Sequence, residues 1–252
     1  MILSLRDQNL AEADQARLAK YHVPVVIAPV MIAEQKSYDN IVIGQADGYI
    51  LTSQQAADAL PQQGANKGSD SAQVDLYARP VFTVGRASAA SARQKGYYNV
   101  YHGPSDGRAL ADMIATHPAA KGRHLCWLRA VKISFDIAGA LHEMGQDITE
   151  AIIYEMVPAA ALADDVCHAL ATAQITGIMA LSQAQLGQFE DLLHHHKLWQ
   201  ACHNIDLYVV SEAVGNAARK SGWSSVWQAR RKRAVSVQAL VRWRHKQIGQ
   251  KT

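Results

Sequence analysis

Cysteine is scarce in this chain of 252 residues, and its three copies, Cys126, Cys167 and Cys202, lie far apart. No two of them form a Cys-x-x-Cys pair, which argues against a disulfide framework or a zinc knuckle. Unpaired thiols are typical of the reducing cytosol, so we expect a cytoplasmic protein. The histidines at 194–196 are consecutive, and neighbours on a helix point about 100° apart. They cannot all face one ion, and we expect no metal site.

Long apolar runs are also missing. The richest run, Val23–Ala33, is interrupted by Pro24 and Pro29, and it falls short of the roughly 18 apolar residues of a membrane span. The first residues carry neither a basic segment nor a small-residue cleavage site, so we expect no secretory signal and no membrane span. The net charge of +3 is too small to indicate a polyanionic partner by itself.

The common phosphate-binding and nucleophile motifs are absent as well. No Gly-x-Gly-x-x-Gly follows an apolar run, and neither a Walker loop nor a Gly-x-Ser-x-Gly elbow occurs. The segment 84–89 has a single glycine, Gly85, which is too little for a dinucleotide site. These absences argue against the commonest nucleotide-binding and hydrolase functions.

What the chain does contain is an internal duplication. Three blocks realign in the same order when the sequence is shifted along itself by about half its length. The aligned pairs are 5–6 with 128–129, 49–54 with 178–183, and 82–87 with 208–213. This period is far longer than the roughly 20–50 residues of solenoid repeats. It predicts a duplicated domain, with two similar lobes facing each other across a cleft.

Short apolar segments alternate with helical patterns, which is the signature of parallel α/β units. The expected strands include Ile2–Leu5, Gly48–Leu51, Val81–Val84, Leu125–Leu128, Gly177–Leu181 and Leu207–Val210. The expected helices include Asn9–Lys20, Gln54–Leu60, Ser88–Lys95 and Gln185–His195. Residues 61–74 are polar and glycine-rich and predict a surface loop. We therefore expect an α/β fold whose parallel sheets are flanked by helices.

Hydroxyl side chains follow several of these strands, at Thr52, Ser53, Ser182 and Ser211. In parallel sheets ligands bind at the carboxyl ends of strands, where helix N-termini offer free N–H groups to anions. Any one of these serines can equally be a helix cap. Because the position recurs in both copies, the set as a whole favours an anion site.

Two arginines, Arg6 and Arg129, end the first strand of each copy. Arginine favours bidentate contacts with carboxylate or phosphate, so both are candidate anion ligands. The alternative for each is a solvated loop charge.

The order of these motifs resembles that of the uroporphyrinogen-III synthase family. The segments that carry the resemblance are 47–56, 81–89, 128–129, 153–155 and 180–182. They follow one another at matching spacing over nearly the whole chain, and the internal duplication accompanies them.

The resemblance implies a fold of two α/β lobes joined by a two-stranded connector, with the active-site cleft between the lobes. One lobe would be discontinuous, comprising residues 1–33 and 157–252. The other would be inserted and comprise residues 36–152. The connector would lie around 30–36 and 152–158, in segments marked by proline.

The resemblance also implies a cofactor-free lyase of tetrapyrrole (haem) biosynthesis. Such an enzyme cyclises hydroxymethylbilane to uroporphyrinogen III, with inversion of ring D and loss of water. Tyr154 occupies the family's tyrosine position and is the candidate general acid, since a protonated phenol can donate to a leaving hydroxyl. The alternative is a tyrosine packed on the connector. The candidates for binding the substrate's carboxylate arms are Arg6, Thr52, Ser53, Ser88, Arg129, Ser182 and Ser211.

As to partners, we expect a monomer that takes hydroxymethylbilane as its substrate, in a transient hand-off from hydroxymethylbilane synthase. We expect no nucleic acid as a partner. The basic segment Arg230–Arg233 could contact one, but such a run is more often a solvated face.

Departures from the family's pattern keep a second interpretation open. Leu5 stands where threonine usually precedes the arginine, and Ala130 stands where glycine is usual. The segment 211–215 has lost most of its hydroxyls, and Glu212 within it would repel a carboxylate arm. These changes are compatible with a non-catalytic two-lobed homologue that binds a tetrapyrrole or another polycarboxylate.

Overall fold

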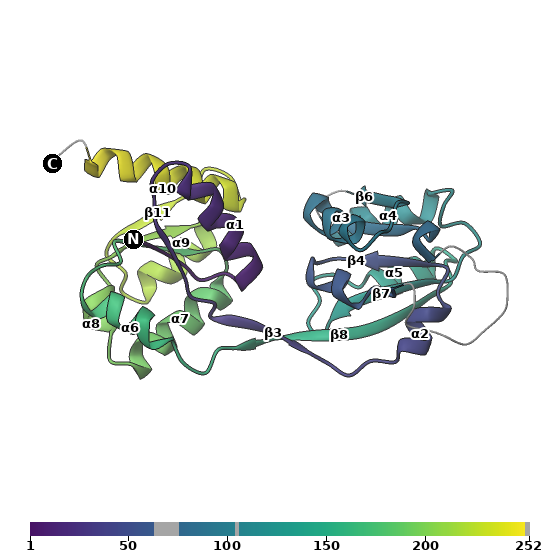
Figure 1. The fold of residues 1–252 in the computed structure, drawn as a ribbon, viewed down its shortest axis with the longest axis horizontal. Coiled ribbons are helices and arrows are strands. Elements are labelled where there is room, and N and C mark those ends of the chain that lie inside the picture. Colours follow the sequence, from purple (N-terminus) through teal and green to yellow (C-terminus); the bar gives the residue numbers. More distant parts are fainter. Residues whose placement is uncertain (63–75, 104–105, 250–252) are drawn as a thin grey trace. The chain divides into compact units, whose positions relative to one another are not determined.

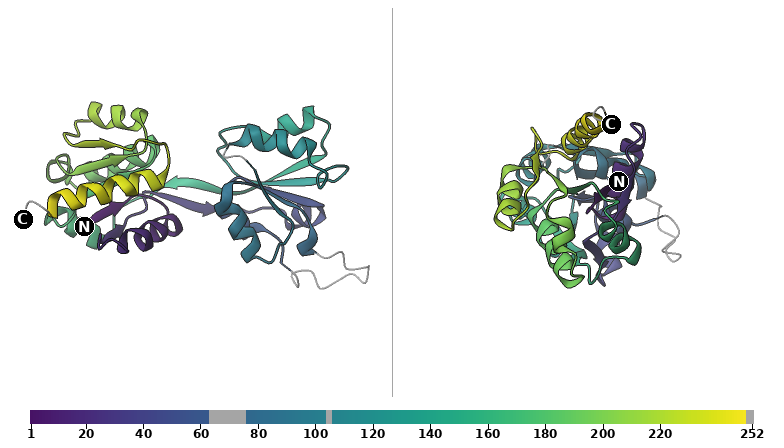
Figure 2. Two further views of the ribbon diagram at one scale, coloured as in Figure 1. Left: turned by 90° about the horizontal axis from the view of Figure 1, so that it is seen from above. Right: turned by 90° about the vertical axis from the view of Figure 1, so that its left-hand side faces the viewer.

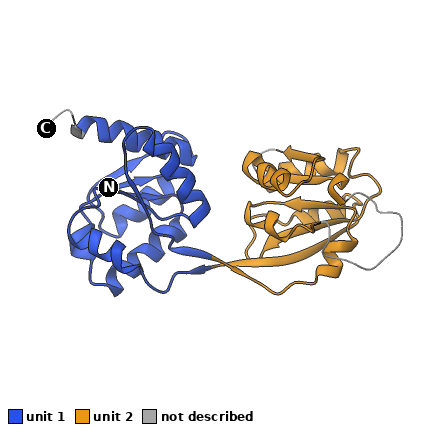
Figure 3. Cartoon of the chain, viewed as in Figure 1, with its two compact units in different colours: residues 1–32, 157–252 blue, residues 33–156 orange. Residues whose placement is uncertain are grey.

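The computed structural model describes residues 1–62, 76–103 and 106–249. The predicted surface loop at 61–74 lies outside these ranges except for its first two residues. The chain divides into two compact units (Figure 3), the first formed by Met1–Ile32 and Val157–Thr252 and the second by Ala33–Met156. Both units are built on parallel strands flanked by helices, which confirms the predicted α/β class.

The first unit contains a five-stranded parallel sheet with the strand order β11-β10-β9-β1-β2 (Figure 1). Its strands are β1 (Ile2–Ser4), β2 (Val25–Ile27), β9 (Gly177–Ala180), β10 (Asp206–Val209) and β11 (Val226–Gln228). Successive residues of β1 enter opposite cores, because Ile2 and Leu3 belong to different buried clusters. A sheet covered on both faces needs apolar residues on both sides of its strands, which is why short apolar runs identified these strands in the sequence.

Helices cover both faces of this sheet. On one face α1 (Gln8–Ala19) and α10 (Ala234–Gly249) lie side by side, and Leu18 shares a buried cluster with Val237 and Val241 (Figure 2). On the other face lie α6 (Asp164–Ala171), α7 (Gln183–His195), α8 (Trp199–Cys202) and α9 (Glu212–Lys220). In α7 the buried side chains Leu186, Phe189 and Leu193 recur at three- and four-residue spacing, which forms an apolar stripe.

The second unit contains a six-stranded sheet in the order β3-β8-β7-β4-β5-β6. Its strands are β3 (Met31–Gln35), β4 (Gly48–Leu51), β5 (Val81–Val84), β6 (Val100–Gly103), β7 (Leu125–Ala130) and β8 (Ile148–Pro158). The strands from β8 to β6 are parallel. β3 runs antiparallel to β8, since Lys36 N–H donates to the Ile153 carbonyl and Ala159 N–H to the Val30 carbonyl. The chain therefore crosses between the units within these two paired strands.

The helices of the second unit also cover both faces of its sheet. α4 (Gly107–Thr116) and α5 (Ile137–Glu143) pack on one face. The other face carries α2 (Asn40–Gln45), the 3₁₀-helices η1 (Gln55–Ala59) and η2 (Leu76–Ala78), and α3 (Gly85–Gln94). The helix predicted at Gln54–Leu60 is thus a 3₁₀-helix, whose small buried alanines pack closely on the sheet.

Gly85 has φ +78° and turns the chain from β5 directly into α3, a backbone conformation that favours glycine. α3 therefore begins three residues before the predicted start at Ser88. No described helix of the protein is both long and apolar enough to cross a membrane.

Candidate functional site

The candidate site lies in the second unit, at the point where the strand order reverses. From β4 the chain continues to β5 and β6 on one side, whereas β7 and β8 lie on the other side of β4. In doubly wound sheets ligands bind at such a reversal, outside the carboxyl ends of the strands. A pocket of about 360 Å³ is found there. It is lined by Thr52, Val84 and Ala130 at the ends of β4, β5 and β7, and by Gly107 and Ile137 at the starts of α4 and α5.

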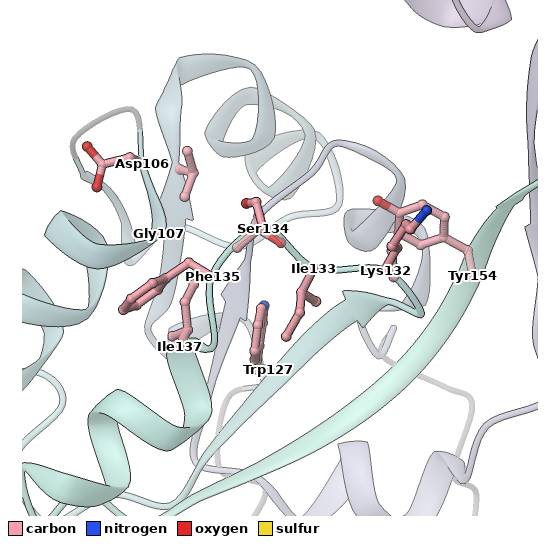
Figure 4. A pocket seen from close by; sticks show the side chains of 12 residues that line it. Asp106, Gly107, Trp127, Lys132, Ile133, Ser134, Phe135, Ile137 and Tyr154 are labelled. Atoms are coloured by element: carbon pink, nitrogen blue, oxygen red, sulfur yellow. The ribbon is translucent and has the colours of Figure 1, made fainter. Parts of the chain in front are cut away.

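Polar groups converge on this pocket from four segments of the chain (Figure 4). The polar lining residues are Thr52, Asp106, Trp127, Lys132, Ser134 and Tyr154. The Asp106 carboxylate caps α4 by accepting a hydrogen bond from Ala109 N–H at 2.9 Å. The pocket is therefore supplied mainly with hydrogen-bond donors and one ammonium group, which suits an anionic ligand with several acceptors.

Tyr154, the predicted general acid, lies in this pocket because β8 contains a bulge. Arg129 pairs with Ile152, but the next residue of β7, Ala130, pairs with Tyr154. In a regular strand Tyr154 would share the face of Ile152, which is 40% exposed, yet Tyr154 is only 7% exposed. The extra residue turns the tyrosine inward, and re-aiming a side chain beside a site is a typical use of a bulge.

Thr52 is the other predicted residue that the structure brings to the same pocket. Its neighbour Ser53 accepts a hydrogen bond from Ala56 N–H at 3.2 Å, so it acts as the cap of η1. Ser88 is buried within α3 and belongs to neither the lining nor the mouth of the pocket. Of the hydroxyl residues predicted in the second unit, one therefore lines the pocket and two lie elsewhere.

Arg129 is occupied by groups of its own unit. Its guanidinium forms an ion pair with Glu150 and donates to the carbonyls of Ala130 at 3.0 Å and Val131 at 3.2 Å. These contacts hold the end of β7, and Arg129 is not among the residues that line the pocket. The arginine that sequence reasoning assigned to the substrate thus supports the strand that carries the site.

Arg6 has a similar position in the first unit. It forms an ion pair of 2.8 Å with Asp14, whose side chain is only 2% exposed. The same carboxylate accepts hydrogen bonds from Ser4 Oγ and from Gln238 Nε2. A buried carboxylate needs such partners to remain charged, so Arg6 joins the end of β1 to α1.

The two remaining predicted serines begin helices of the first unit. Ser182 caps α7 by accepting a hydrogen bond from Gln185 N–H at 3.1 Å. Ser211 precedes α9 without a side-chain cap bond and lines a separate pocket of about 430 Å³. Glu212, Arg230 and Lys232 line the same pocket, so two exposed members of the predicted basic segment lie beside the serine.

Sequence reasoning missed Trp127, Lys132 and Ser134. Trp127 reads as one more apolar residue of a buried strand, and Lys132 and Ser134 lie in the irregular segment after β7. The positions of Lys132 and Ser134 depend on the path of the chain between β7 and α5, and no local sequence pattern specifies that path. In the part of the chain that the structure describes, no group of three or more His, Cys, Asp or Glu residues is arranged to hold a metal ion.

Comparison with known proteins relates the chain to one family. The sequence model of uroporphyrinogen-III synthase HemD matches residues 12–238, whereas no curated protein matches the sequence. Uroporphyrinogen-III synthetase from Helicobacter pylori has a similar fold, with a TM-score of 0.58 at 13% identity over 95% of this chain and 97% of that one. A mutant uroporphyrinogen III synthase from Thermus thermophilus gives a TM-score of 0.49 at 15% identity, over 97% of this chain and 98% of the other. Because the family match spans most of the sequence, the chain belongs to the uroporphyrinogen-III synthase HemD family.

Proposed function

We propose that this protein cyclises hydroxymethylbilane to uroporphyrinogen III, with inversion of ring D and release of water. Membership of the family supports the reaction. One structural observation supports the location of the chemistry: Tyr154, turned inward by the bulge in β8, shares a pocket with Thr52 at the carboxyl ends of the strands.

In the proposed reaction Tyr154 donates a hydrogen bond, and then its proton, to the hydroxyl of the substrate's hydroxymethyl group. The hydroxyl leaves as water, and the adjacent pyrrole nitrogen stabilises the azafulvene cation that remains. Ring D attacks this cation through its substituted carbon and forms a spirocyclic intermediate. Breaking and re-forming the bond to the neighbouring ring inverts ring D. Loss of a proton from the last ring restores its aromaticity and returns the proton to the tyrosinate.

The larger contribution of the protein is control of conformation. Hydroxymethylbilane is a flexible chain that closes without inversion when its ends meet unassisted. Orienting two reacting groups can account for about 7–11 kcal/mol of a barrier. We assign this role to donors that hold the carboxylate arms. Thr52, Ser134 and Lys132 are the candidates in the second unit, and Ser211 with Arg230 and Lys232 are those in the first.

The proposed chemistry needs only a proton donor and anchoring groups, and we therefore propose a lyase that works without a cofactor. We further propose a cytoplasmic monomer that accepts its substrate from hydroxymethylbilane synthase. The test of this last point is kinetic: coupling the two enzymes should reduce the amount of type I isomer below the value calculated for free diffusion of the intermediate.

Isomer analysis tests the central proposal. Hydroxymethylbilane is generated in the assay, the products are oxidised to porphyrins, and the type I and type III isomers are separated by chromatography. Addition of this protein should shift the product from type I to type III. Type I alone, at every protein concentration, would exclude the synthase.

A second candidate, a non-catalytic homologue that binds a tetrapyrrole or another polycarboxylate, is favoured by one observation. Glu212 brings a negative charge to the pocket that contains Ser211, where a carboxylate arm would bind. Binding of uroporphyrinogen without any isomer shift would support this candidate. If instead the protein is active, it produces the type III isomer. Glu212→Gln should then lower its KM for hydroxymethylbilane, because the repulsion of a carboxylate arm is removed.

A further inference from the structure

The indole N–H of Trp127 is a buried donor without an acceptor. Trp127 is 1% exposed, and its Nε1 is the buried side-chain nitrogen that has no hydrogen-bond partner among the described residues. An unsatisfied buried donor destabilises a fold, so such groups are rare and call for an explanation. The same residue lines the pocket that contains Tyr154.

The surroundings of Trp127 favour a ligand as the missing partner. Figure 4 shows the indole nitrogen at the end of the ring that points toward the segment from Lys132 to Phe135. The Arg129 guanidinium lies 5.6 Å from the centre of the ring and contacts its face, which leaves the N–H available. The face of the ring is thus used within the protein, whereas the N–H is directed at the pocket.

The chemistry of the pocket indicates which ligand group this is. The pyrrole nitrogens of a tetrapyrrole are donors, so the acceptors it offers to an indole N–H are its carboxylates and its single hydroxymethyl oxygen. Lys132 adds an ammonium group to the same pocket, which attracts a carboxylate. The Asp106 carboxylate also lines the pocket, where it caps the start of α4 by accepting from Ala109 N–H.

We propose that Trp127 Nε1 and Lys132 Nζ form a binding subsite for one carboxylate arm of the tetrapyrrole. This subsite rests on the proposed function for the identity of its ligand. It gives Trp127, a member of a buried cluster, a second role in binding the ligand. Because Nε1 is shielded from solvent, the subsite requires the segment after β7, which Figure 4 shows beside the indole, to shift when the carboxylate binds.

Substitution of Trp127 by phenylalanine removes the N–H and keeps an aromatic ring. Trp223→Phe is the matched control, because Trp223 is 3% exposed but its Nε1 donates to Glu190 at 2.8 Å. The ligand is uroporphyrin III, the oxidised and unreactive octacarboxylate of the proposed product, and its Kd is measured by anisotropy of the porphyrin fluorescence. Trp127→Phe should raise this Kd about tenfold, the loss of roughly one hydrogen bond to a charged group.

The control separates binding from folding. Both substitutions remove the same ring volume, but Trp223→Phe also removes one donor from Glu190, which keeps the Ser221 hydroxyl. Trp223→Phe should therefore lose more thermal stability than Trp127→Phe and keep the wild-type Kd. If Trp127→Phe does not fold, Lys132→Met is tested in its place, because the Lys132 side chain is exposed. Lys132→Met should raise the Kd severalfold at low salt, and less at high salt.

A Kd within twofold of wild type in Trp127→Phe, or in Lys132→Met where that variant is used, would overturn the subsite. So would a wild-type protein that does not bind uroporphyrin III at all. The isomer assay distinguishes these failures from failure of the proposed function. A wild-type protein that makes the type III isomer, together with an unaffected Kd in the variants, would refute the subsite and leave the synthase intact.

Discussion

The hydroxyl of Tyr154 can be removed without removing its ring, which packs in a buried cluster of the second unit. If this hydroxyl protonates the leaving group, Tyr154→Phe should lower kcat by about 10²–10⁴-fold, the usual contribution of a positioned acid. The KM should stay close to the wild-type value, because the carboxylate arms keep their donors. The measurement is the initial rate of type III formation, with circular dichroism to verify the fold.

Tyr97→Phe is the control for this prediction. Tyr97 is also buried in the second unit, but its hydroxyl donates to the Pro61 carbonyl at 2.9 Å and does not line the pocket. This variant should lose thermal stability and keep its kcat. Unchanged kcat in Tyr154→Phe would remove the tyrosine from the proposed mechanism.

Residues of the site could be predicted only where local position determines their role. Thr52 follows a strand end and lines the pocket, as expected for that position. Arg6 follows β1 and Arg129 lies near the end of β7, yet Asp14 and Glu150 pair with them. The sequence shows that an arginine is present, but the tertiary structure determines which carboxylate pairs with it. Trp127 was missed for a different reason. In an apolar strand a tryptophan is interpreted as a core residue, and the sequence does not show that its N–H points toward a pocket.

At the scale of elements, the buried parallel strands could be predicted from the sequence. A strand covered on both faces must be apolar throughout, and Gly48–Leu51 and Val81–Val84 were expected with the bounds that they have. Short elements that depend on tertiary packing were not identified correctly. α2 lacks a full apolar period, and η1 was expected as a helix but is a 3₁₀-helix.

The helix α10 makes a pH-sensitive contact with β10. Arg244 forms an ion pair of 3.0 Å with Asp206. Burial by itself would raise the pKa of the Asp206 carboxyl, but hydrogen bonds from Ser225, Arg244 and Trp227 outweigh it and hold the pKa below its usual value. A carboxyl with a lowered pKa stabilises the fold above the pKa of the unfolded chain, and this contribution is lost as the pH falls through the folded-state pKa.

The stability of wild type should therefore fall more steeply than that of Asp206→Asn between about pH 5 and pH 3. At neutral pH the variant should be the less stable protein, because Arg244 has lost its charged partner. Urea unfolding at a series of pH values provides the comparison. Parallel pH profiles for the two proteins would show that Asp206 does not couple α10 to the acid stability of the unit.

At the scale of the whole molecule, each unit has its own interior. Each of the four buried clusters draws its residues from one unit, two from the first and two from the second. The chain nevertheless enters and leaves the second unit through one pair of strands, β3 and β8. Two-state unfolding is usual for single domains and often fails for proteins with several domains. Because the two units have separate cores, we expect them to unfold in separate transitions.

Arg6→Ala tests whether the units unfold separately. The substitution leaves the buried Asp14 carboxylate without its cation, and breaking a buried ion pair in this way costs about 3 kcal/mol. In a urea titration followed by hydrogen exchange and mass spectrometry, peptides of residues 1–32 and 157–252 should lose protection at lower urea than in wild type. Peptides of 33–156 should keep their wild-type midpoint. Lys20→Ala, at the exposed residue that follows α1, is the control and should shift neither group. An equal shift of both groups in Arg6→Ala would mean that the two cores unfold as one cooperative structure, joined through β3 and β8.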